Sequence, residues 1–305
     1  MAPPRAPRHN PSMSQMSTRA WGLLILLSAL WGGSFLFVGL AVREWPPLSI
    51  ALSRVALAAL ALWLFIAWQR QAPRLDGPAL RAHAGMGLLN NAIPFVLIIW
   101  AQGTLPAGEA AVFNATTPLF GVLVAHALAT ERATPSRLAG VALGMLGVAV
   151  MVGADPLATP WPAALAMLGA TFSYALAGQW GRRFRELGVP PIHAAAGQTS
   201  AATLLLLPLA LWFEAPGMPG PTTIIALLGL ALISTAIAYA IYFQLLALAG
   251  PVNLLLVTLL IPVSSFALAA VFLNESLAPR HLLGMAGIAA GLALIDGRLF
   301  RHKSG

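Results

Sequence analysis

The feature that most constrains this chain is a succession of ten long apolar stretches separated by short polar connectors. Each approaches the roughly 20 residues that an α-helix needs to cross the hydrocarbon of a bilayer. The stretches are Trp21–Val42, Pro47–Trp68, Leu80–Trp100, Gly108–Ala129, Pro135–Val152, Trp161–Trp180, Ile192–Trp212, Thr222–Leu248, Val252–Leu273 and Pro279–Ile295. None alternates like a barrel strand, and an open sheet would leave backbone groups unpaired in lipid. We therefore predict an all-α polytopic membrane protein with ten transmembrane helices.

Composition agrees with a chain whose solvent is lipid. Of its 305 residues, 59% are hydrophobic and 9% are charged, whereas a soluble domain carries roughly 25% charge. The net charge of +8 could suggest a nucleic-acid partner, but the cations lie between the apolar stretches and not along one face. We therefore expect contact with the bilayer and none with nucleic acid. The lack of cysteine excludes disulfides and thiolate metal sites.

The positions of the cations predict the orientation, because Lys and Arg in short loops stay on the cytoplasmic side. If the N-terminus is inside, fourteen of the seventeen cations lie in cytoplasmic segments. These are Arg5, Arg8, Arg19, Arg70, Arg74, Arg81, Arg132, Arg137, Arg182, Arg183, Arg185, Arg298, Arg301 and Lys303. Outside loops hold Arg43 and Arg280, and Arg54 lies within a span. An odd number of spans would put the two termini on opposite sides and place many of these cations outside. We therefore expect a multi-pass protein of the bacterial inner membrane with both termini in the cytoplasm.

The ends of the chain are expected to lie outside the helical bundle. Residues 1–19 contain four prolines and no apolar period, which is typical of a disordered tail. The apolar run that follows is too long for the core of a signal peptide, so it should remain as a helix. Residues 298–305 form a short basic tail. The stretches between these tails divide into two five-helix repeats, residues 20–153 and 161–297.

The two halves resemble each other at a constant offset of 144 residues. The matching pairs are Pro118 and Pro262, Glu131 and Glu275, Pro135 and Pro279, Gly140 and Gly284, Gly147 and Gly291, Asn91-Ala92-Ile93 and Thr235-Ala236-Ile237, and Arg54 and Gln198. Because five is odd, the second repeat must enter the membrane from the opposite side. Inverted repeats are typical of secondary transporters, which bind their solute near the midplane between the repeats. The sequence therefore predicts a transporter.

Two prolines mark the expected solute cavity. Pro118 and Pro262 fall near the centres of the fourth and ninth spans, where each removes a hydrogen bond to the carbonyl four residues earlier. The carbonyls of Asn114 and Thr258 would thereby be freed at mid-membrane depth, beside the Thr117 side chain. Irregular backbone at this depth is tolerated in protein or against a wet cavity. The alternative is a structural kink whose carbonyls are bonded by neighbouring Ser or Thr hydroxyls.

Aromatic and polar residues deep in other spans complete the predicted cavity lining. Trp31 lies midway along the first span, although Trp usually prefers the membrane interface. The three tyrosines of the chain lie similarly deep in the sixth and eighth spans. The further candidates are Ser34, Asn91, Tyr174, Tyr239 and Tyr242. For the aromatic residues, ordinary core packing is the alternative.

Four charged residues are assigned structural or gating roles. Arg54 lies about seven residues into the second span, where we expect either a buried pair with Glu109 or snorkelling to the headgroups. Glu131 and Glu275 end the fourth and ninth spans, each four residues before a proline that suits the first turn of the next helix. Each carboxylate is expected to be stabilised by the N–H groups of that next helix.

Sites for catalysis, metals or cofactors are not expected, since the sequence contains no HExxH, P-loop or GxSxG motif and no acidic cluster. A membrane enzyme acting on lipid-linked substrates and a non-transporting sensor or scaffold remain as alternatives to a transporter. The pairs Gly140/Gly144 and Gly287/Gly291 on spans five and ten allow close helix contact. They could serve either packing within the chain or a homodimer.

Taken together, these residues resemble the EamA-type branch of the drug/metabolite transporter superfamily over nearly the whole chain. The resemblance is carried by the Trp31-Gly32-Gly33-Ser34-Phe35 segment, Arg54, Ala107-Gly108-Glu109-Ala110-Ala111 leading into Pro118, the Glu131-Arg132 and Asn274-Glu275 hairpins, and the stretch from Thr235-Ala236-Ile237-Ala238-Tyr239 to Gly250-Pro251. It implies a ten-helix inverted-repeat fold that moves metabolites, amino acids or drugs, often outward. The family's cavity is lined by spans one, three, four, six, eight and nine. The second glycine, Gly33, and the doubled Asn90-Asn91 depart from the family pattern and would alter the shape of that cavity.

Overall fold

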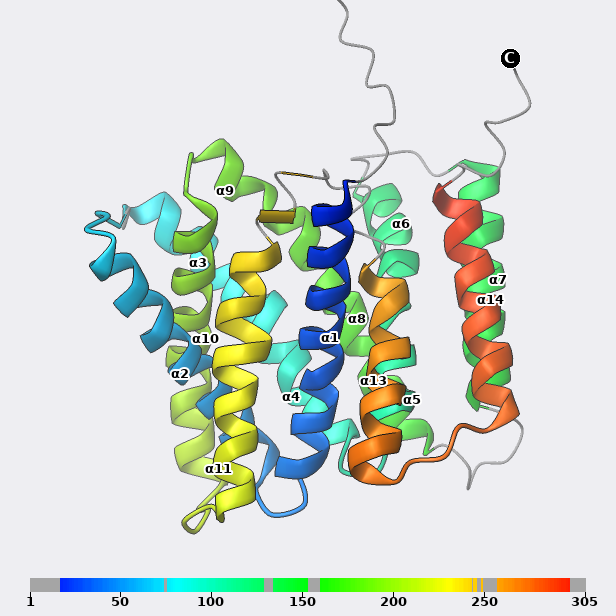
Figure 1. The fold of residues 1–305 in the computed structure, drawn as a ribbon. Coiled ribbons are helices and arrows are strands. Elements are labelled where there is room, and N and C mark those ends of the chain that lie inside the picture. Colours follow the sequence, from blue (N-terminus) through cyan, green and yellow to red (C-terminus); the bar gives the residue numbers. More distant parts are fainter. Residues whose placement is uncertain are drawn as a thin grey trace, which may run out of the picture.

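The computed structural model describes residues 17–73, 76–128, 134–152, 160–242, 244–245, 248 and 257–296, and the regular structure within these residues is helical. The first half contains α1 (Thr18–Ala41), α2 (Pro47–Trp68), α3 (Gly77–Gly87), η1 (Leu88–Ala92), α4 (Ile93–Ala101), α5 (Ala107–Asn114), α6 (Thr117–Ala127) and α7 (Pro135–Val152). The second contains α8 (Trp161–Trp180), α9 (Arg182–Glu186), α10 (Pro191–Phe213), α11 (Pro221–Leu228), η2 (Gly229–Ile237), α13 (Val257–Leu273) and α14 (Pro279–Asp296). The elements run up and down through one bundle (Figure 1).

Six helical stretches within the described residues are long and apolar enough to cross a membrane. They are Thr18–Ala41, Pro47–Trp68, Gly77–Ala101, Ala107–Ala127, Pro191–Phe213 and Pro221–Tyr242. Shorter apolar helices are Pro135–Met151, Leu260–Leu273 and Pro279–Ile295. Large apolar side chains such as Trp212, which is 84% exposed, and Leu211, which is 75% exposed, cover the outside of the bundle. These features define a polytopic membrane protein, because a soluble fold does not tolerate so much exposed apolar surface.

Three of the apolar stretches are not regular α-helices along their whole length. The third changes from α3 into the π-helix η1 and then continues as α4. The eighth changes from α11 into the π-helix η2, where the Thr235 hydroxyl donates to the carbonyl five residues earlier. The fourth is interrupted between α5 and α6, two residues before Pro118. Wide π turns occur often at functional sites, so these irregular segments point to where the site lies.

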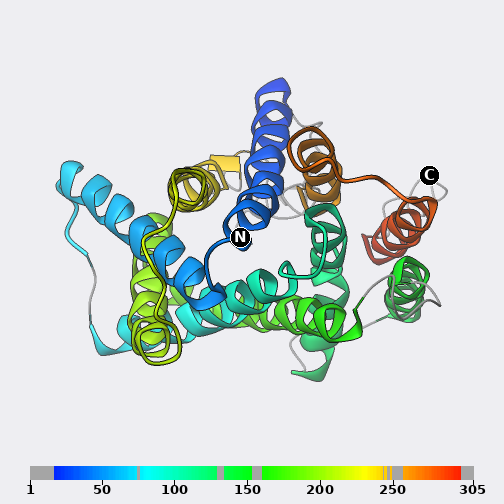
Figure 2. The ribbon, with the colours of Figure 1, turned by 90° about the horizontal axis from the view of Figure 1, so that it is seen from below.

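Helices α7 and α14 pack against each other at one side of the bundle (Figure 2). Their contact is made by glycines: a Cβ added to Gly147 would lie 2.7 Å from the Gly284 carbonyl oxygen, and one added to Gly140 would lie 2.6 Å from the Gly291 oxygen. The backbones therefore touch directly, as small residues permit. The predicted small-residue pairs thus serve packing within the chain, while a homodimer stays a prediction.

The remaining helices surround the centre of the molecule. Helix α1 packs against α13 and η2, α2 packs against α10 and η2, and α8 packs against α4 and α6 (Figure 2). The start of α1 and the end of α14 lie at the same end of the bundle, which we call the terminal end (Figure 1). Helices α11 and α5 begin at the other end, which we call the opposite end (Figure 1).

Candidate functional site

A cluster of polar side chains lies inside the bundle where α2 meets η2 and where α10 meets η1. We call it the central polar cluster and define it as Arg54, Asn90, Asn91, Gln198, Thr235 and Tyr239. Polar groups without partners are costly in hydrocarbon, so such a cluster in a membrane protein normally faces the bundle interior and marks a functional site.

Arg54 is buried, with 7% of its surface exposed, and makes two contacts. Its Nε donates a hydrogen bond to the Thr235 hydroxyl at 3.1 Å, and its guanidinium carbon lies 3.8 Å from the centre of the Phe95 ring. Arg54 makes no ion pair with a carboxylate in the described part of the chain. A cation in the bundle is therefore held by a hydroxyl and an aromatic face, and no carboxylate of the described residues pairs with it.

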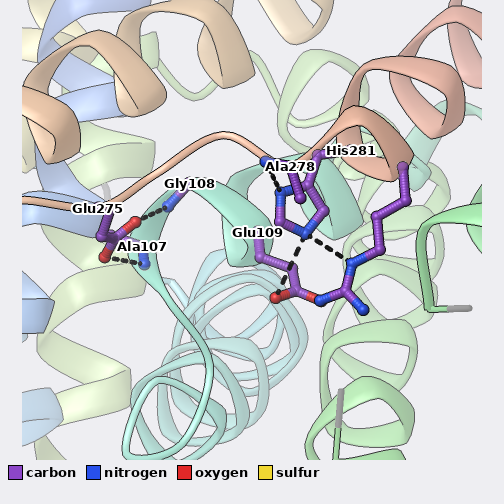
Figure 3. A network of polar contacts seen from close by, with 7 residues as sticks. Ala107, Gly108, Glu109, Glu275, Ala278 and His281 are labelled. Atoms are coloured by element: carbon purple, nitrogen blue, oxygen red, sulfur yellow. Dashed lines mark hydrogen bonds and ion pairs between the residues drawn. The ribbon is translucent and has the colours of Figure 1, made fainter. Parts of the chain in front are cut away.

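The predicted pairing of Arg54 with Glu109 is wrong. Glu109 is on α5, which packs against α13, whereas Arg54 is on α2, which packs against α10 and η2. Glu109 is 1% exposed, and its Oε2 lies 4.0 Å from Nε2 of His281 at the start of α14 (Figure 3). The sequence placed Arg54 and Glu109 at similar depths, but depth does not determine which helices are neighbours.

The other part of the central polar cluster is held by amide groups. Asn90 Nδ2 donates to Gln198 Oε1 at 3.1 Å and to the Tyr239 hydroxyl at 3.3 Å. Asn91 is fully buried and also lies near that hydroxyl. Asn90 belongs to the first half of the chain, and Gln198 and Tyr239 belong to the second. The amides therefore tie the two halves together inside the membrane.

The two parts of the cluster correspond to each other at the 144-residue offset. Arg54 corresponds to Gln198, and Asn91 corresponds to Thr235. Arg54 on α2 reaches Thr235 on η2, while Gln198 on α10 reaches Asn90 on η1, next to Asn91. Each half thus places a long polar side chain against the π-helix of the other half.

The predicted aromatic lining residues lie on helices around this cluster. The rings of Trp31 and Tyr242 pack with centroids 5.7 Å apart, at 40° to each other. Tyr174, on α8, is partly buried and packs against both of the large apolar clusters of the bundle. The Ser34 hydroxyl donates to the Trp31 carbonyl at 2.6 Å. Trp31 and Tyr242 thus form one contact group, whereas Ser34 bonds to the backbone of its own helix.

The proline-linked residues have a different local structure in the two halves. The Asn114 carbonyl, which Pro118 leaves without a backbone donor, accepts a hydrogen bond from the Thr117 hydroxyl at 2.8 Å. This is the bonding that the kink alternative anticipates. In the second half, Pro262 is buried and lies inside α13, which continues through it. Thr258 is partly buried one turn earlier. Pro118 therefore stands at a helix break and Pro262 does not.

Glu275 caps a different helix from the one predicted. Its two oxygens accept hydrogen bonds from the backbone N–H groups of Ala107, at 2.7 Å, and Gly108, at 3.0 Å (Figure 3). These groups open α5, whereas the sequence pointed to the following helix, α14. Glu275 does bind a helix N-terminus, as predicted, but that helix belongs to the first half of the chain, whereas Glu275 belongs to the second. Glu131 lies outside the described residues.

Four functional candidates were missed from the sequence: Asn90, Gln198, Glu44 and Glu214. The first two had a signal, because Asn90 was a departure from the family pattern and Gln198 was the counterpart of Arg54. A sequence signal also marked the two glutamates. Each lies two residues after an apolar stretch and near a helix that begins with proline and has no capping side chain of its own.

Comparisons with known proteins show the family and the fold of the chain. The chain belongs to the EamA-like transporter family, whose model matches it twice, over residues 19–153 and 161–296. It is 28% identical over 290 residues to a protein of Escherichia coli K12 named "Probable amino-acid metabolite efflux pump", covering 91% of this chain and 94% of that protein. It is 27% identical to "Uncharacterized inner membrane transporter YedA" of the same organism, covering 90% of each chain.

Two further matches extend the comparison. Protein PecM of Dickeya dadantii is 26% identical over 225 residues, which are 72% of this chain and 74% of PecM. A solved crystal structure with 21% sequence identity superposes with a TM-score of 0.66, covering 92% of this chain and 98% of the other. The fold of that structure is therefore the fold of this chain. Family and relatives together identify a membrane transporter.

Proposed function

We propose that the protein is a secondary transporter that moves small metabolites across the bacterial inner membrane, in the outward direction, by alternating access around the central polar cluster. The observation that carries this proposal is the contact of the two family-matched halves inside the bundle, where the buried Arg54 and Gln198 side chains bond to polar side chains of two π-helices. Polar groups at this depth stabilise a solute that leaves water, and a cluster built from both halves can rearrange when the halves rock.

The proposal includes ten spans in two inverted repeats. Support comes from helix contacts that correspond when each span is exchanged with its counterpart in the other half. The contact of α1 with α13 corresponds to that of α8 with α6, and the contact of α4 with α8 corresponds to that of α1 with η2. The contact of α2 with η2 corresponds to that of α10 with η1, and α7 with α14 is its own counterpart. A duplicated unit in two opposite orientations accounts for this pattern.

The proposed orientation places the terminal end of the bundle in the cytoplasm. It rests on the distribution of cations described above and on the rule that Lys and Arg remain inside. Arg183 exemplifies the terminal end: it is exposed, and its guanidinium carbon lies 3.8 Å from the centre of the Trp180 ring. Outward transport is proposed from the printed names of the efflux pumps among the relatives.

Two solute classes were open from the sequence, amino acids and amphipathic drug-like solutes. The charge of the central polar cluster favours a solute with a carboxylate, because Arg54 is buried there and the part of the chain that the structure describes offers it no paired carboxylate. A solute carboxylate would supply that negative charge, whereas an amphipathic cation would be repelled by it. Trp31 and Tyr242, which pack against each other, would contact the apolar part of the solute.

The direct test is flux of labelled amino acids, other carboxylates and amphipathic cations in proteoliposomes. We expect flux of a carboxylate-bearing solute, and loss of that flux in the double variant Trp31→Ala with Asn114→Ala. Trp161→Ala is the matched control, since Trp161 is 66% exposed on the outside of the bundle. Flux that survives the double variant would remove these two residues from the site. No flux of any solute in the wild type would overturn the proposed function.

A further inference from the structure

Three glutamates that follow the ends of helices bind the N-termini of other helices. They are Glu44 after α1, Glu214 after α10 and Glu275 after α13, and they bind the starts of α11, α2 and α5. The N-cap residues of these three helices are Gly220, Pro46 and Pro106, and none of them provides a capping side chain. The first N–H groups of a helix lack partners within it, so each glutamate supplies acceptors that the local sequence lacks.

Glu214 holds the start of α2 with both of its oxygens. Oε1 accepts from the Leu48 N–H at 2.9 Å, and Oε2 accepts from the Ser49 N–H at 2.7 Å. The Ser49 hydroxyl donates to the same Oε2 at 2.7 Å. A carboxylate that accepts several hydrogen bonds at a helix N-terminus also interacts favourably with the helix dipole. The connection after α10 is thereby fixed to the start of α2.

Glu44 makes the reciprocal contact with the start of α11. Its Oε1 accepts from the Gly220 N–H at 2.9 Å, and its Oε2 accepts from the Thr223 hydroxyl. Next to it, the Trp45 ring N–H donates to the Gly217 carbonyl at 3.1 Å. The α1–α2 connection and the α10–α11 connection therefore bind each other from both sides. We call this pair of contacts the first clasp.

Glu275 forms the second clasp with the start of α5. Asn274 adopts a left-handed conformation, with φ of 57°, which ends α13. The Glu275 N–H then bonds to the Ala269 carbonyl, six residues earlier, at 3.3 Å, so the chain folds back over the last turn of α13. This turn aims the Glu275 side chain at the Ala107 and Gly108 N–H groups (Figure 3).

Both clasps join the first half of the chain to the second, and both lie at the opposite end of the bundle (Figure 1). At the terminal end the described contacts differ. Asp76 caps its own helix through the Ala79 N–H at 2.9 Å. Neutral bonds join the halves there: the Trp180 ring N–H donates to the Ala82 carbonyl, and the Ser136 hydroxyl donates to the Leu294 carbonyl, each at 3.1 Å. Charge-assisted hydrogen bonds are roughly twice as strong as neutral ones, so the clasps are the stronger of these links between the halves among the residues that the structure describes.

We propose that the two clasps are the gate latch of the opposite end: Glu44, Glu214 and Glu275 hold that end closed, and they must release their helix N-termini each time it opens. This inference rests on the proposed alternating access, because rocking halves separate at each end in turn. All of these bonds cross between the halves, so separation at this end breaks them together. The three residues act as positioning residues for the solute pathway and do not contact the solute.

The test is spin-label distance measurement in the full-length protein in lipid nanodiscs. The chain has no cysteine, so introduced cysteines are labelled without background. One pair, Thr104→Cys with Met218→Cys, uses exposed residues from the two halves at the opposite end. A second pair, Gln71→Cys with Arg185→Cys, uses exposed residues from the two halves at the terminal end. The measurement needs no transported solute.

Each glutamate is replaced by glutamine, which keeps the shape and one acceptor but removes the charge. We expect Glu214→Gln and Glu275→Gln each to raise the ratio of long to short distances at the opposite end about tenfold. For the pair at the terminal end, the ratio of long to short distances should fall. Glu186→Gln is the matched control, since Glu186 is exposed on α9 at the terminal end, and it should leave both distance distributions unchanged.

A milder pair of variants keeps the inference testable if a glutamine variant does not fold. Ser49→Ala and Thr223→Ala remove one donor to a glutamate each and leave the carboxylate in place. They should produce the same shift with a smaller amplitude. Unchanged distances at the opposite end in the folded glutamine variants would overturn the latch. Absence of flux in a wild type whose distances respond as expected would instead overturn the proposed function.

Discussion

Replacing Arg54 with Gln should leave the fold almost unchanged and abolish transport of carboxylates. The change makes position 54 identical to its counterpart in the other half, where Gln198 already occupies the equivalent place on α10 and bonds to η1. The fold therefore already accommodates glutamine in this setting. The charge that we assign to solute binding is removed at the same time.

The expected size of the stability change follows from opposing contributions at Arg54. The side chain lies about 10 Å into α2, at a rise of about 1.5 Å per residue, where a charge costs roughly 2.5–3.5 kcal/mol on insertion scales. Against this, its hydrogen bond to Thr235 contributes about 1.5–3 kcal/mol, and its contact with Phe95 contributes about 2 kcal/mol. The Thr235 hydroxyl keeps its bond to the Leu230 carbonyl at 2.8 Å. The difference between these contributions is about 0–2.5 kcal/mol, so the free energy of unfolding should fall by no more than about 2.5 kcal/mol.

The assay pairs thermal unfolding in nanodiscs with flux in proteoliposomes. Phe113→Ala serves as the structural reference, since Phe113 is fully buried and its truncation should cost about 3–5 kcal/mol. Arg54→Lys keeps the charge but loses the planar contact with Phe95, so it should retain part of the flux. An Arg54→Gln variant that unfolds as easily as Phe113→Ala, or that carries carboxylates at the wild-type rate, would refute the reasoning.

Three further outcomes are expected. Gly147→Ala should destabilise the protein by about 1–3 kcal/mol, because the added Cβ would lie 2.7 Å from a carbonyl oxygen of α14. The control Gly178→Ala in α8 adds a Cβ that meets nothing within 4 Å, so it should not destabilise the protein. Equal thermal stability of the two variants would contradict direct backbone contact between α7 and α14. Tyr239→Phe should lower carboxylate flux with a stability loss of about 1 kcal/mol, since it removes one acceptor of the Asn90 amide; unchanged flux would remove this hydroxyl from the site. Single cysteines at Gln71 and Arg43 should react with impermeant reagents from the cytoplasmic and the outer side, respectively, and labelling of both from one side would contradict the proposed orientation.

Much of the helical structure could be predicted from hydropathy and proline positions. The predicted stretch Pro47–Trp68 has the bounds of α2, and Trp161–Trp180 has those of α8. Such boundaries are readable because proline favours the first turn of a helix and because apolar length is set by the bilayer. Membership of the EamA family was likewise predicted from residues spread along the chain, and it is confirmed.

Lateral contacts and local helix geometry could not be predicted in the same way. The sequence fixes how deep Arg54 and Glu109 lie, but the neighbour of each depends on how helices are arranged around the centre. The π-helices have no hydropathy signal, because an extra residue in a turn changes register and not composition. The partner of Glu275 was misplaced for a related reason: a helix N-terminus accepts a carboxylate from any element that reaches it.

The π-helix η2 has a consequence for how the eighth apolar stretch can move. One residue of an α-helix corresponds to about 100° of rotation about its axis. If the wide turns of η2 tightened by one residue into α geometry, Tyr239 and Tyr242 would swing by roughly that angle relative to Pro221, where α11 begins. The backbone hydrogen bonds would exchange partners without leaving any group bare to lipid. The aromatic side chains of this stretch could thus change direction while the helix stays continuous and its N-terminal part stays in place.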